Sequence, residues 1–404
     1  MGELKINHRL IMTPGPTMAD PRVLQAMSNQ ILGQFDPDFT QIMNENMEMI
    51  RQSFNTKNHW SFPIDGTSRA GNEAVISSIV RSGDTVLVPV FGRFGDLFVE
   101  LAKRSGGEVH TLNTDWGSVF DQAVIIEEIN RLKPKVVAIV HGETSTGRLQ
   151  PLDRIGAAVH EYGGFLVVDA VASYLGTSLA VDEWQLDAVV GGAQKCLSIP
   201  SGITPITFND RFATEINQRK QVEQGIRTVA DAAGADFISS NYLDLTQLQD
   251  YWSPRRLNHH TEATVADYAL HEGLHLALKE GLSKRIARHL LVHQALSAGL
   301  KAMGLEIYHE GENEMPMVTC VIIPAGLNDS DFRNQLLKTF QVEISGSFGS
   351  LTGKIWRIGT MGYSAQPGFI MNFIALFGAA LLQTGAVVDL KAGLDAAQAV
   401  FTQE

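Results

Sequence analysis

Short apolar segments alternate with helical patterns from about residue 64 to residue 210, and this alternation constrains the fold more than any other feature. Strands are predicted over residues 85–90 and 136–140, and helices over residues 95–104 and 155–162. Two further apolar segments lead to Asp169 and Lys195. Such a rhythm predicts an α/β fold with a mostly parallel sheet covered on both faces. Ligands then bind at the carboxyl ends of the strands.

The pattern changes in the last third of the chain. A helical pattern runs with few breaks from residue 264 to about residue 303, and strand patterns follow over residues 319–323 and 354–358. This order predicts a second, smaller α+β domain that the long helix joins to the first. We expect an N-terminal segment of residues 1–18, a large domain of residues 19–282 and a small C-terminal domain of residues 283–404.

The composition is that of an ordinary soluble globular protein. Hydrophobic residues make up 44% of the 404 positions and charged residues 19%. The net charge of -12 argues against a surface for nucleic acid or anionic membranes. The chain contains two cysteines, no apolar signal segment and no apolar stretch long enough to span a membrane. We therefore expect a cytoplasmic protein.

An acid at one strand end and a lysine beyond the next strand suggest a cofactor site. Asp169 ends the segment Gly164-Phe165-Leu166-Val167-Val168-Asp169, and Lys195 follows Asp187-Ala188-Val189-Val190 by five residues. Sites for pyridoxal phosphate (PLP) are commonly built in this way, because the lysine forms a Schiff base and the acid keeps the pyridinium nitrogen protonated. Taken alone, the acid could be a turn former and the lysine a solvated cation.

Residues 65–73 are a candidate phosphate site. The sequence Asp-Gly-Thr-Ser-Arg-Ala-Gly-Asn-Glu precedes a helical pattern whose apolar face contains Val75, Ile76, Ile79 and Val80. Free backbone N–H groups and the helix dipole can hold a phosphate there. An ordinary Ser/Thr helix cap is the alternative reading of such a segment.

Other polar residues follow or interrupt predicted strands. The segment 141–147, His-Gly-Glu-Thr-Ser-Thr-Gly, lies where a parallel sheet binds ligands, or else forms a polar loop. Arg357 lies inside an apolar strand, so it would bind a substrate carboxylate or form a structural ion pair. His259 and His260 lack a ligand spacing to other His or Cys residues, so no metal site is predicted. Cys196 is expected to be a small buried residue.

These segments resemble class V aminotransferases of the alanine–glyoxylate group. The resemblance covers nearly the whole chain and includes Thr13-Pro14-Gly15-Pro16-Thr17, residues 140–153, Val167-Val168-Asp169-Ala170-Val171-Ala172-Ser173, Gly192-Ala193-Gln194-Lys195 and Trp356-Arg357-Ile358-Gly359. It implies PLP fold type I, the aspartate aminotransferase-like α/β fold with a large domain built on a mostly parallel seven-stranded sheet. It also implies a homodimer whose active sites are shared between the subunits.

The resemblance assigns roles to individual residues. Lys195 would bind PLP and shuttle protons in a ping-pong transamination, and Asp169 would pair with the ring nitrogen. Arg357 would take the substrate carboxylate. The remaining residues expected to contact the cofactor are Thr67, Ser68 and Gln194 at the phosphate, Arg69, Thr144 at the phenolic oxygen, Val171 under the ring, Phe94 where the family often has a stacked Trp, and Thr261 from the partner subunit.

Two amides bear on the substrate. Gln34 and Asn258, the latter where alanine–glyoxylate enzymes have Tyr, resemble the ureidoglycine–glyoxylate aminotransferases of purine catabolism. Side-chain amides match the N–H groups and carbonyl of a ureido group. The resemblance thus implies (S)-ureidoglycine as amino donor and a 2-oxo acid such as glyoxylate or pyruvate as acceptor.

Other readings of the same fold stay open at this stage. The nearest alternative reaction is alanine- or serine-dependent transamination of glyoxylate or pyruvate. A cysteine desulfurase or lyase would need a mobile-loop cysteine, whereas Cys320 lies in a strand-like segment. A non-catalytic PLP-binding regulator would normally carry a DNA-binding module, for which the acidic chain leaves no room.

Overall fold

A computed structural model describes residues 2–229, 231 and 236–402. The strands are β1 (Leu10–Ile11), β2 (Trp60–Asp65), β3 (Thr85–Val90), β4 (Glu108–Asn113), β5 (Val136–Val140), β6 (Gly142–Glu143), β7 (Arg148–Leu149), β8 (Phe165–Asp169), β9 (Ala188–Val190), β10 (Ile203–Phe208), β11 (Val318–Ile322), β12 (Val342–Glu343), β13 (Ser345–Gly346) and β14 (Ile355–Gly359). The α-helices are α1 (Pro21–Ala26), α2 (Pro37–Ser53), α3 (Ser68–Ile79), α4 (Arg93–Arg104), α5 (Gln122–Leu132), α6 (Ile155–His160), α7 (Asp210–Asn217), α8 (Leu245–Trp252), α9 (Thr264–Glu280), α10 (Leu282–Ala302), α11 (Asp329–Phe340), α12 (Pro367–Gln383) and α13 (Leu390–Phe401). Two short 3-10 helices span Gly349–Leu351 and Gly362–Ser364.

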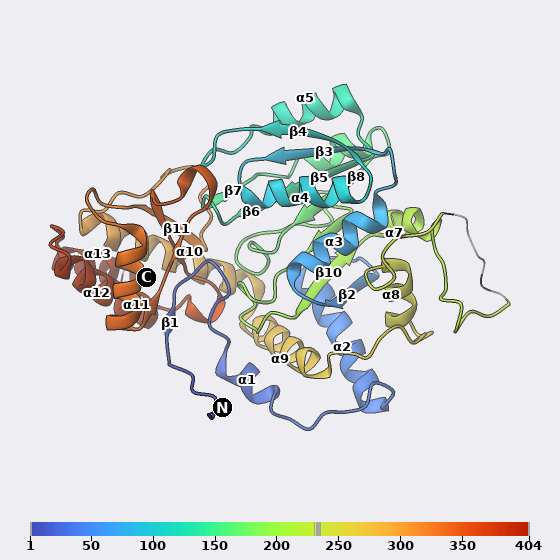
Figure 1. Cartoon of the computed structure of the whole chain (residues 1–404), viewed down its shortest axis with the longest axis horizontal. Helices are drawn as coiled ribbons and strands as arrows, with labels where there is room; N and C mark the ends of the chain where they lie inside the picture. Colours follow the sequence, from blue (N-terminus) through green and yellow to red (C-terminus); the bar gives the residue numbers. More distant parts are fainter. Residues whose placement is uncertain (1, 230, 232–235, 403–404) are drawn as a thin grey trace.

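A seven-stranded sheet forms the larger lobe, in the order β2-β10-β9-β8-β5-β3-β4. The neighbouring pairs from β9 to β4 are parallel, and β10 runs antiparallel to both β9 and β2. The predicted α/β fold with a mostly parallel sheet is therefore confirmed. Because β2 has the same direction as the parallel strands, the carboxyl ends of β2, β3, β5, β8 and β9 lie at one edge of the sheet (Figure 1).

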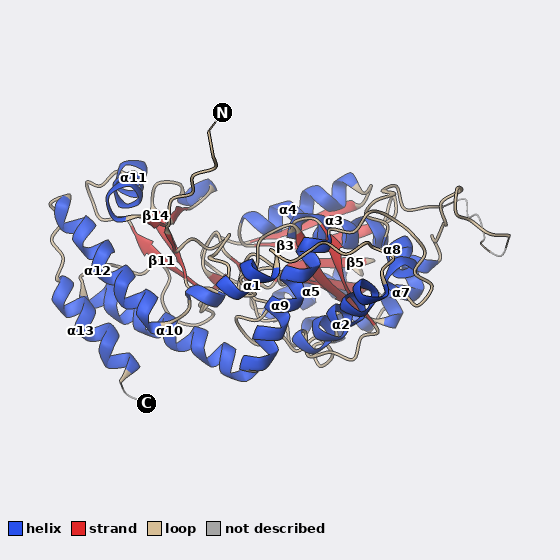
Figure 2. Ribbon diagram, turned by 90° about the horizontal axis from the view of Figure 1, so that it is seen from below, coloured by secondary structure: helices blue, strands red, loops and turns tan. Residues whose placement is uncertain are grey.

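The smaller lobe is built on a second sheet of order β11-β14-β13, which Figure 2 shows beside α10, α12 and α13. Strand β11 begins and ends one residue earlier than predicted, and β14 begins and ends one residue later. Strand β1 pairs in parallel with β12, so part of the N-terminal segment belongs to this lobe. Among the described residues, no helix is both long and apolar enough to cross a membrane.

Two hydrophobic cores support a division into two domains. The larger core surrounds the seven-stranded sheet, and the smaller core contains Phe332, Trp356, Phe373 and Phe377 from the C-terminal elements. The division is not clean in sequence, because Met12 belongs to the smaller core and Met317 to the larger one. The boundaries expected near residues 18 and 282 stay a prediction.

The prediction of one long helix from residue 264 to about residue 303 is wrong. Gly281, with φ of 88° and ψ of 133°, ends α9 and separates it from α10. Glycine reaches this region of backbone conformation without the steric cost that a Cβ atom would impose. The apolar periodicity continues through the break, which is why a pattern of side chains alone did not indicate it.

Candidate active site

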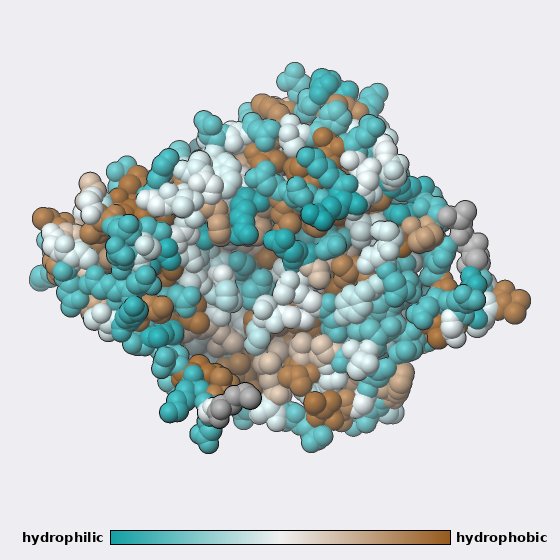
Figure 3. Space-filling model, in the orientation of Figure 1, coloured by the Kyte–Doolittle hydropathy of each residue, from teal (hydrophilic) through white to brown (hydrophobic). Residues whose placement is uncertain are grey.

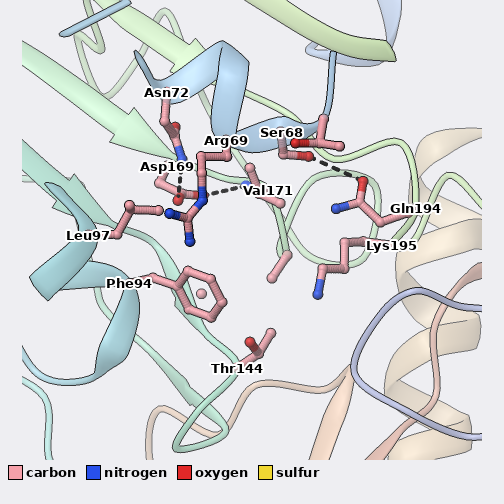
Figure 4. Close-up of a pocket in the computed structure, with 13 residues that line it drawn as sticks. Ser68, Arg69, Asn72, Phe94, Leu97, Thr144, Asp169, Val171, Gln194 and Lys195 are labelled. Carbon is pink, nitrogen blue, oxygen red and sulfur yellow. Dashed lines mark hydrogen bonds between the residues drawn. The ribbon is translucent and has the colours of Figure 1, made fainter. Parts of the chain in front are cut away.

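A cavity of about 180 Å³ opens at the carboxyl edge of the large sheet (Figure 4). The starts of α3 and α4 and the segments after β5, β8 and β9 supply its walls. It is lined by Thr67, Ser68, Arg69, Asn72, Phe94, Leu97, Gly142, Thr144, Asp169, Val171, Ala172, Gln194 and Lys195. All the residues expected to contact the cofactor from within this chain therefore meet in one place.

Lys195 lies on the loop after β9, and its amine points into the cavity (Figure 4). The side chain is buried, and Nζ donates a hydrogen bond to the carbonyl oxygen of Pro14. Gly15 leaves room for it, since a Cβ atom there would collide with Nζ. Burial, helped by the nearby Arg357 charge, lowers the pKa of Lys195 to about 8. A much larger fraction of the amine is thus neutral and nucleophilic near neutral pH than for a lysine in water.

Asp169 is the last residue of β8 and is buried at the end of the cavity opposite the Ser68–Gln194 pair. Its Oδ1 accepts a hydrogen bond from the backbone N–H of Val171 at 2.9 Å, and its Oδ2 accepts one from Nδ2 of Asn72 at 2.8 Å. Burial raises the pKa of Asp169, while these two donors act in the opposite direction. A cationic N–H partner in the cavity would compensate the buried carboxylate charge.

The start of α3 provides an anion site. Thr67 is the N-cap residue, but its side chain makes no capping hydrogen bond, unlike Asp36 at α2 or Asp121 at α5. Ser68 Oγ donates a hydrogen bond to Oε1 of Gln194 at 3.2 Å. Hydroxyl, amide and backbone donors therefore gather at the positive end of a helix, where a phosphate group binds favourably.

Phe94 and Val171 supply apolar walls of the cavity (Figure 4). The backbone N–H of Phe94 donates to Oε2 of Glu143 at 2.8 Å, so a buried carboxylate from the loop after β5 anchors the start of α4. Gly192 lets the loop after β9 approach Val171 closely, since a Cβ atom there would collide with the Val171 carbonyl. The walls leave a slot suited to a flat aromatic ring.

Arg357 reaches the cavity wall from β14 of the smaller lobe. Its NH1 group donates to the carbonyl oxygen of Thr144 at 2.9 Å, and its Nε donates to that of Gly346 at 2.7 Å. The guanidinium carbon lies 4.6 Å from the centre of the Phe348 ring. Burial lowers the pKa of Arg357 to about 10, so the group stays charged at neutral pH. No carboxylate of the described residues forms a salt bridge with it, which leaves its charge for an anionic ligand.

The comparisons with known proteins agree with this geometry. The sequence profile of the Aminotransferase class-V family matches residues 10–358. The chain is a class V aminotransferase. It is 54% identical over 396 residues to the (S)-ureidoglycine–glyoxylate transaminase of Bacillus subtilis (strain 168), covering 97% of this chain and 95% of that protein.

Solved structures resemble the aminotransferase over their whole length. The crystal structure of ureidoglycine–glyoxylate aminotransferase from Bacillus subtilis superposes with a TM-score of 0.94 at 52% identity, covering 99% of this chain and 100% of that one. The alanine–glyoxylate aminotransferase of Nostoc sp. superposes with a TM-score of 0.88 at 34% identity, covering 94% and 97%. Fold type I and the dependence on PLP, both predicted from the sequence, are confirmed.

The cavity of the aminotransferase fits PLP. It combines a buried lysine amine, a buried carboxylate that lacks a cation, a slot with apolar walls and a helix start that can hold phosphate. These features match the aldehyde, the pyridine nitrogen, the ring and the phosphate of the cofactor, respectively. The roles of the individual residues stay predictions.

Besides Arg357, three predicted residues do not line this cavity. Gln34 and Asn258 are joined by a hydrogen bond of 3.0 Å from Nε2 to Oδ1, and Oε1 of Gln34 accepts one of 3.2 Å from the backbone N–H of Glu262. Thr261 is exposed on the same segment. The fold of the aminotransferase thus brings the two amides together, although they are 224 positions apart in sequence. Thr261 follows Asn258 by three positions.

Two contacts of the aminotransferase site were not predicted. Asn72 supports Asp169, and its place four residues after Ser68 on one helix face is a signal that could have found it. Glu143 holds Phe94 and also accepts two hydrogen bonds from Ser145, at 2.9 Å from the backbone and 2.6 Å from the hydroxyl. A carboxylate within the 141–147 loop was visible in the sequence, but its partner on α4 depends on the tertiary structure.

Proposed function

We propose that this enzyme transfers the amino group of (S)-ureidoglycine to a 2-oxo acid such as glyoxylate or pyruvate, a step of purine catabolism. The hydrogen-bonded pair Gln34–Asn258 is the observation that carries the proposal. The 54% identity to the (S)-ureidoglycine–glyoxylate transaminase of Bacillus subtilis supports it. A ureido group offers both donors and a carbonyl, and a side-chain amide pairs with both kinds.

The amide pair also explains how a simpler donor would be rejected. Alanine has a methyl group where ureidoglycine has the ureido group, so amides directed at that position would lose their partners. An unpartnered polar group costs about 1–3 kcal/mol, which corresponds to roughly 5- to 150-fold in rate or affinity. The alanine–glyoxylate reaction is the second candidate, because an alanine–glyoxylate aminotransferase of Nostoc sp. is 34% identical to this chain.

Different groups in and beside the cavity would perform different parts of the reaction. Bound PLP supplies an aldehyde that takes up an amino group and a ring that accepts electrons. We propose that Lys195 holds the resting cofactor, and that its freed Nζ removes the proton from the donor's α-carbon. Asp169 would stabilise positive charge on the ring nitrogen, and Arg357 would orient the donor by its carboxylate.

The remaining residues would hold the cofactor in place. Thr67, Ser68 and Gln194 would bind the phosphate, Thr144 would contact the phenolic oxygen, and Phe94 and Val171 would enclose the ring. Arg69 lines the same cavity from the first turn of α3, where its positive charge favours the phosphate. The donor product leaves before the 2-oxo acid enters, so one cavity serves both halves of a ping-pong reaction.

We also propose that the enzyme is a homodimer whose active sites combine residues of two subunits. Leu24, Ile31 and Phe35 expose 51%, 60% and 74% of their surface on the segment around Gln34. Figure 3 shows hydrophobic residues gathered on this edge of the molecule, near α1 and α2. An exposed apolar patch of this kind is typical of an interface. Light scattering of the eluted holoenzyme should then report twice the mass of one 44.1 kDa chain.

The two cysteines favour neither a desulfurase nor an oxidising compartment. Cys196 and Cys320 are free and buried, and burial raises the pKa of both thiols to about 12. A desulfurase needs an accessible thiolate, and neither residue provides one. Unpaired thiols fit the cytoplasm, where we propose that the enzyme works.

Rapid mixing of the PLP-loaded enzyme with fresh ureidoglycine, and separately with alanine, tests the proposed donor. Absorbance of the cofactor follows the first half-reaction directly. We expect ureidoglycine to react much faster, and Gln34→Ala and Asn258→Ala to slow it about 10- to 100-fold while leaving alanine nearly unchanged. Gln41→Ala, an exposed amide that bonds only to Glu45 nearby, is the matched control.

Two further results would decide between the alternatives. Faster reaction with alanine in the unaltered enzyme would overturn the ureidoglycine assignment and favour the alanine–glyoxylate reaction. A Lys195→Ala enzyme that turned over at the normal rate would instead overturn the whole catalytic scheme.

A further inference from the structure

A buried cluster of one imidazole and two carboxylates lies beside the phosphate end of the cavity. It consists of Asp65, His260 and Glu262, and we refer to it as the His260 cluster. Asp65 ends β2, directly before the turn that starts α3, whereas His260 and Glu262 precede α9. One atom from each residue lies within 4.8 Å of the other two. The side chains of Asp65, His260 and Glu262 are 9%, 10% and 1% exposed, respectively.

The hydrogen bonds of the two histidines determine which nitrogen of His260 faces the carboxylates. Nε2 of His259 lies 3.2 Å from the carbonyl oxygen of Asn241, which can only accept, so Nε2 of a neutral His259 carries the proton. Nδ1 of His259 must then accept the hydrogen bond of 2.8 Å from Nδ1 of His260. Nε2 is therefore the nitrogen of His260 that faces Asp65 and Glu262. Burial opposes it, but these two carboxylates raise the pKa of His260 to about 9, so a metal ion bound at Nε2 would displace a proton.

The distances in the cluster differ from those of ordinary histidine–carboxylate pairs in this protein. Nε2 of His260 lies 3.3 Å from Oδ2 of Asp65 and 3.6 Å from Oε2 of Glu262. The three hydrogen-bonded pairs elsewhere are closer: His160–Asp187 at 2.9 Å, and His271–Glu45 and His293–Glu314 at 2.7 Å. Ligands about 2.0–2.1 Å from a tetrahedral ion lie roughly 3.3–3.4 Å apart, which is close to the two distances from Nε2 of His260.

Each carboxylate of the cluster also has one oxygen without a donor, although Oδ2 of Asp65 accepts a hydrogen bond of 2.9 Å from the backbone N–H of Ala263. Oε2 of Glu262, a residue only 5% exposed, and Oδ1 of Asp65 accept no hydrogen bond. Oδ2 of the fully buried Asp267 is likewise without a donor. Among the described residues, His260 is the only basic side chain at salt-bridge distance from Asp65 or Glu262, and no lysine or arginine forms a salt bridge with any of the three. Three buried carboxyl groups thus share one imidazole, and a second cation would offset the cost of burying their negative charge.

We propose that Asp65, His260 and Glu262 bind one divalent metal ion of the zinc type in a structural site. Imidazole nitrogen together with carboxylate oxygen suits zinc and its neighbours, whereas calcium and magnesium prefer oxygen ligands alone. The ion would join the end of β2 to the segment that carries Asn258 and Thr261. It would thus hold that segment against the loop that forms the phosphate site. The inference does not depend on which amino donor the enzyme uses.

Metal analysis of the holoenzyme tests this site without reference to activity. The protein is treated with a chelator, dialysed against zinc chloride and assayed for bound zinc and melting temperature. We expect one tightly bound zinc ion per chain and a higher melting temperature with zinc. His260→Gln and Glu262→Gln should each weaken zinc binding by roughly 100-fold or more, because changes to groups that merely support a ligand already cost about 10- to 100-fold. His271→Gln, which removes a histidine bonded to one carboxylate, should bind zinc normally.

Cobalt provides a second measurement that needs no variant. Substituted into the unaltered holoenzyme, Co²⁺ in a site with nitrogen and oxygen ligands should give visible absorption bands that zinc displaces. Equal zinc binding by the unaltered enzyme and His260→Gln would overturn the proposal. So would a His260 ring that NMR shows protonated on both nitrogens in the presence of zinc, since an imidazolium would then supply the missing charge.

Discussion

At the scale of single residues, burial determines the chemistry of the site. It lowers the pKa of Lys195 to about 8 and raises that of Asp169, because burial disfavours the charged form of each group. Asn72 and the Val171 N–H act against burial at Asp169 by stabilising its carboxylate. Both groups are therefore prepared for a ligand that forms a bond to one and supplies a positive charge to the other.

Asp169→Asn should separate cofactor binding from catalysis. The amide keeps the shape of the side chain and can donate to an unprotonated ring nitrogen, so the cofactor should remain attached to Lys195. The loss of charge should lower kcat by roughly 100- to 1000-fold, which is typical for the removal of one electrostatic contact. Cofactor absorbance and steady-state rates measure the two effects. A variant with full cofactor and nearly normal kcat would contradict the role given to Asp169.

At the scale of elements, the way in which individual helices begin and end determines what they can bind. Some helices away from the cavity begin with Asp or Asn side chains that cap them, for example Asp36 at α2 and Asn328 at α11. The helix that starts at the phosphate end, α3, begins with Thr67 and has no such cap. Its N–H groups are thus left for a ligand. The break at Gly281 is equally local, because one backbone conformation divides a continuous apolar pattern into α9 and α10.

Gly281→Ala should destabilise the protein by about 1–3 kcal/mol, because an L-residue is strained at this φ and ψ. No heavy atom lies within 4 Å of the position of a new Cβ atom, so the strain is the only expected cost. Gly368→Ala on α12 is the control, since its surroundings are also open and its backbone is helical. Urea unfolding of the two variants should show a loss at position 281 and little change or a small gain at position 368. Equal stability of both variants would show that α9 and α10 can adjust at the break.

At the scale of the whole molecule, the site gathers residues from both lobes and, by our proposal, from two chains. Arg357 comes from the smaller lobe, and Lys195 and Asp169 come from the larger one. Gln34, Asn258 and Thr261 lie together outside the cavity of their own chain. A second subunit would place this group at the cavity of its neighbour.

Mixed dimers should reveal the shared site. Lys195→Ala and the double variant Asn258→Ala/Thr261→Ala should each be impaired as homodimers. After unfolding and refolding together, a mixed dimer contains one site in which Lys195, Asn258 and Thr261 are all present. Random association should then restore about a quarter of the normal activity with ureidoglycine. No recovery, with mixed dimers verified by mass, would place each active site within a single chain.

The sequence alone determined the fold class, the cofactor and most of the residues that line the cavity. These properties depend on local signals: apolar strands with polar residues at their ends, and short motifs whose order along the chain resembles that of a known family. Strands 85–90 and 136–140 are found where they were predicted. The Asp169–Lys195 pair was visible for the same reason, because each residue follows its own strand.

Only the tertiary structure decided which distant side chains meet. Glu143 reaches the start of α4, Gln34 bonds to Asn258, and Asp65 joins His260 and Glu262 across 195 and 197 positions of sequence. The absence of a metal site was predicted because the histidines have no partner nearby in sequence, yet the end of β2 brings a carboxylate to them. Contacts of this kind follow from the packing of whole elements, which sets distances that no spacing along the chain contains.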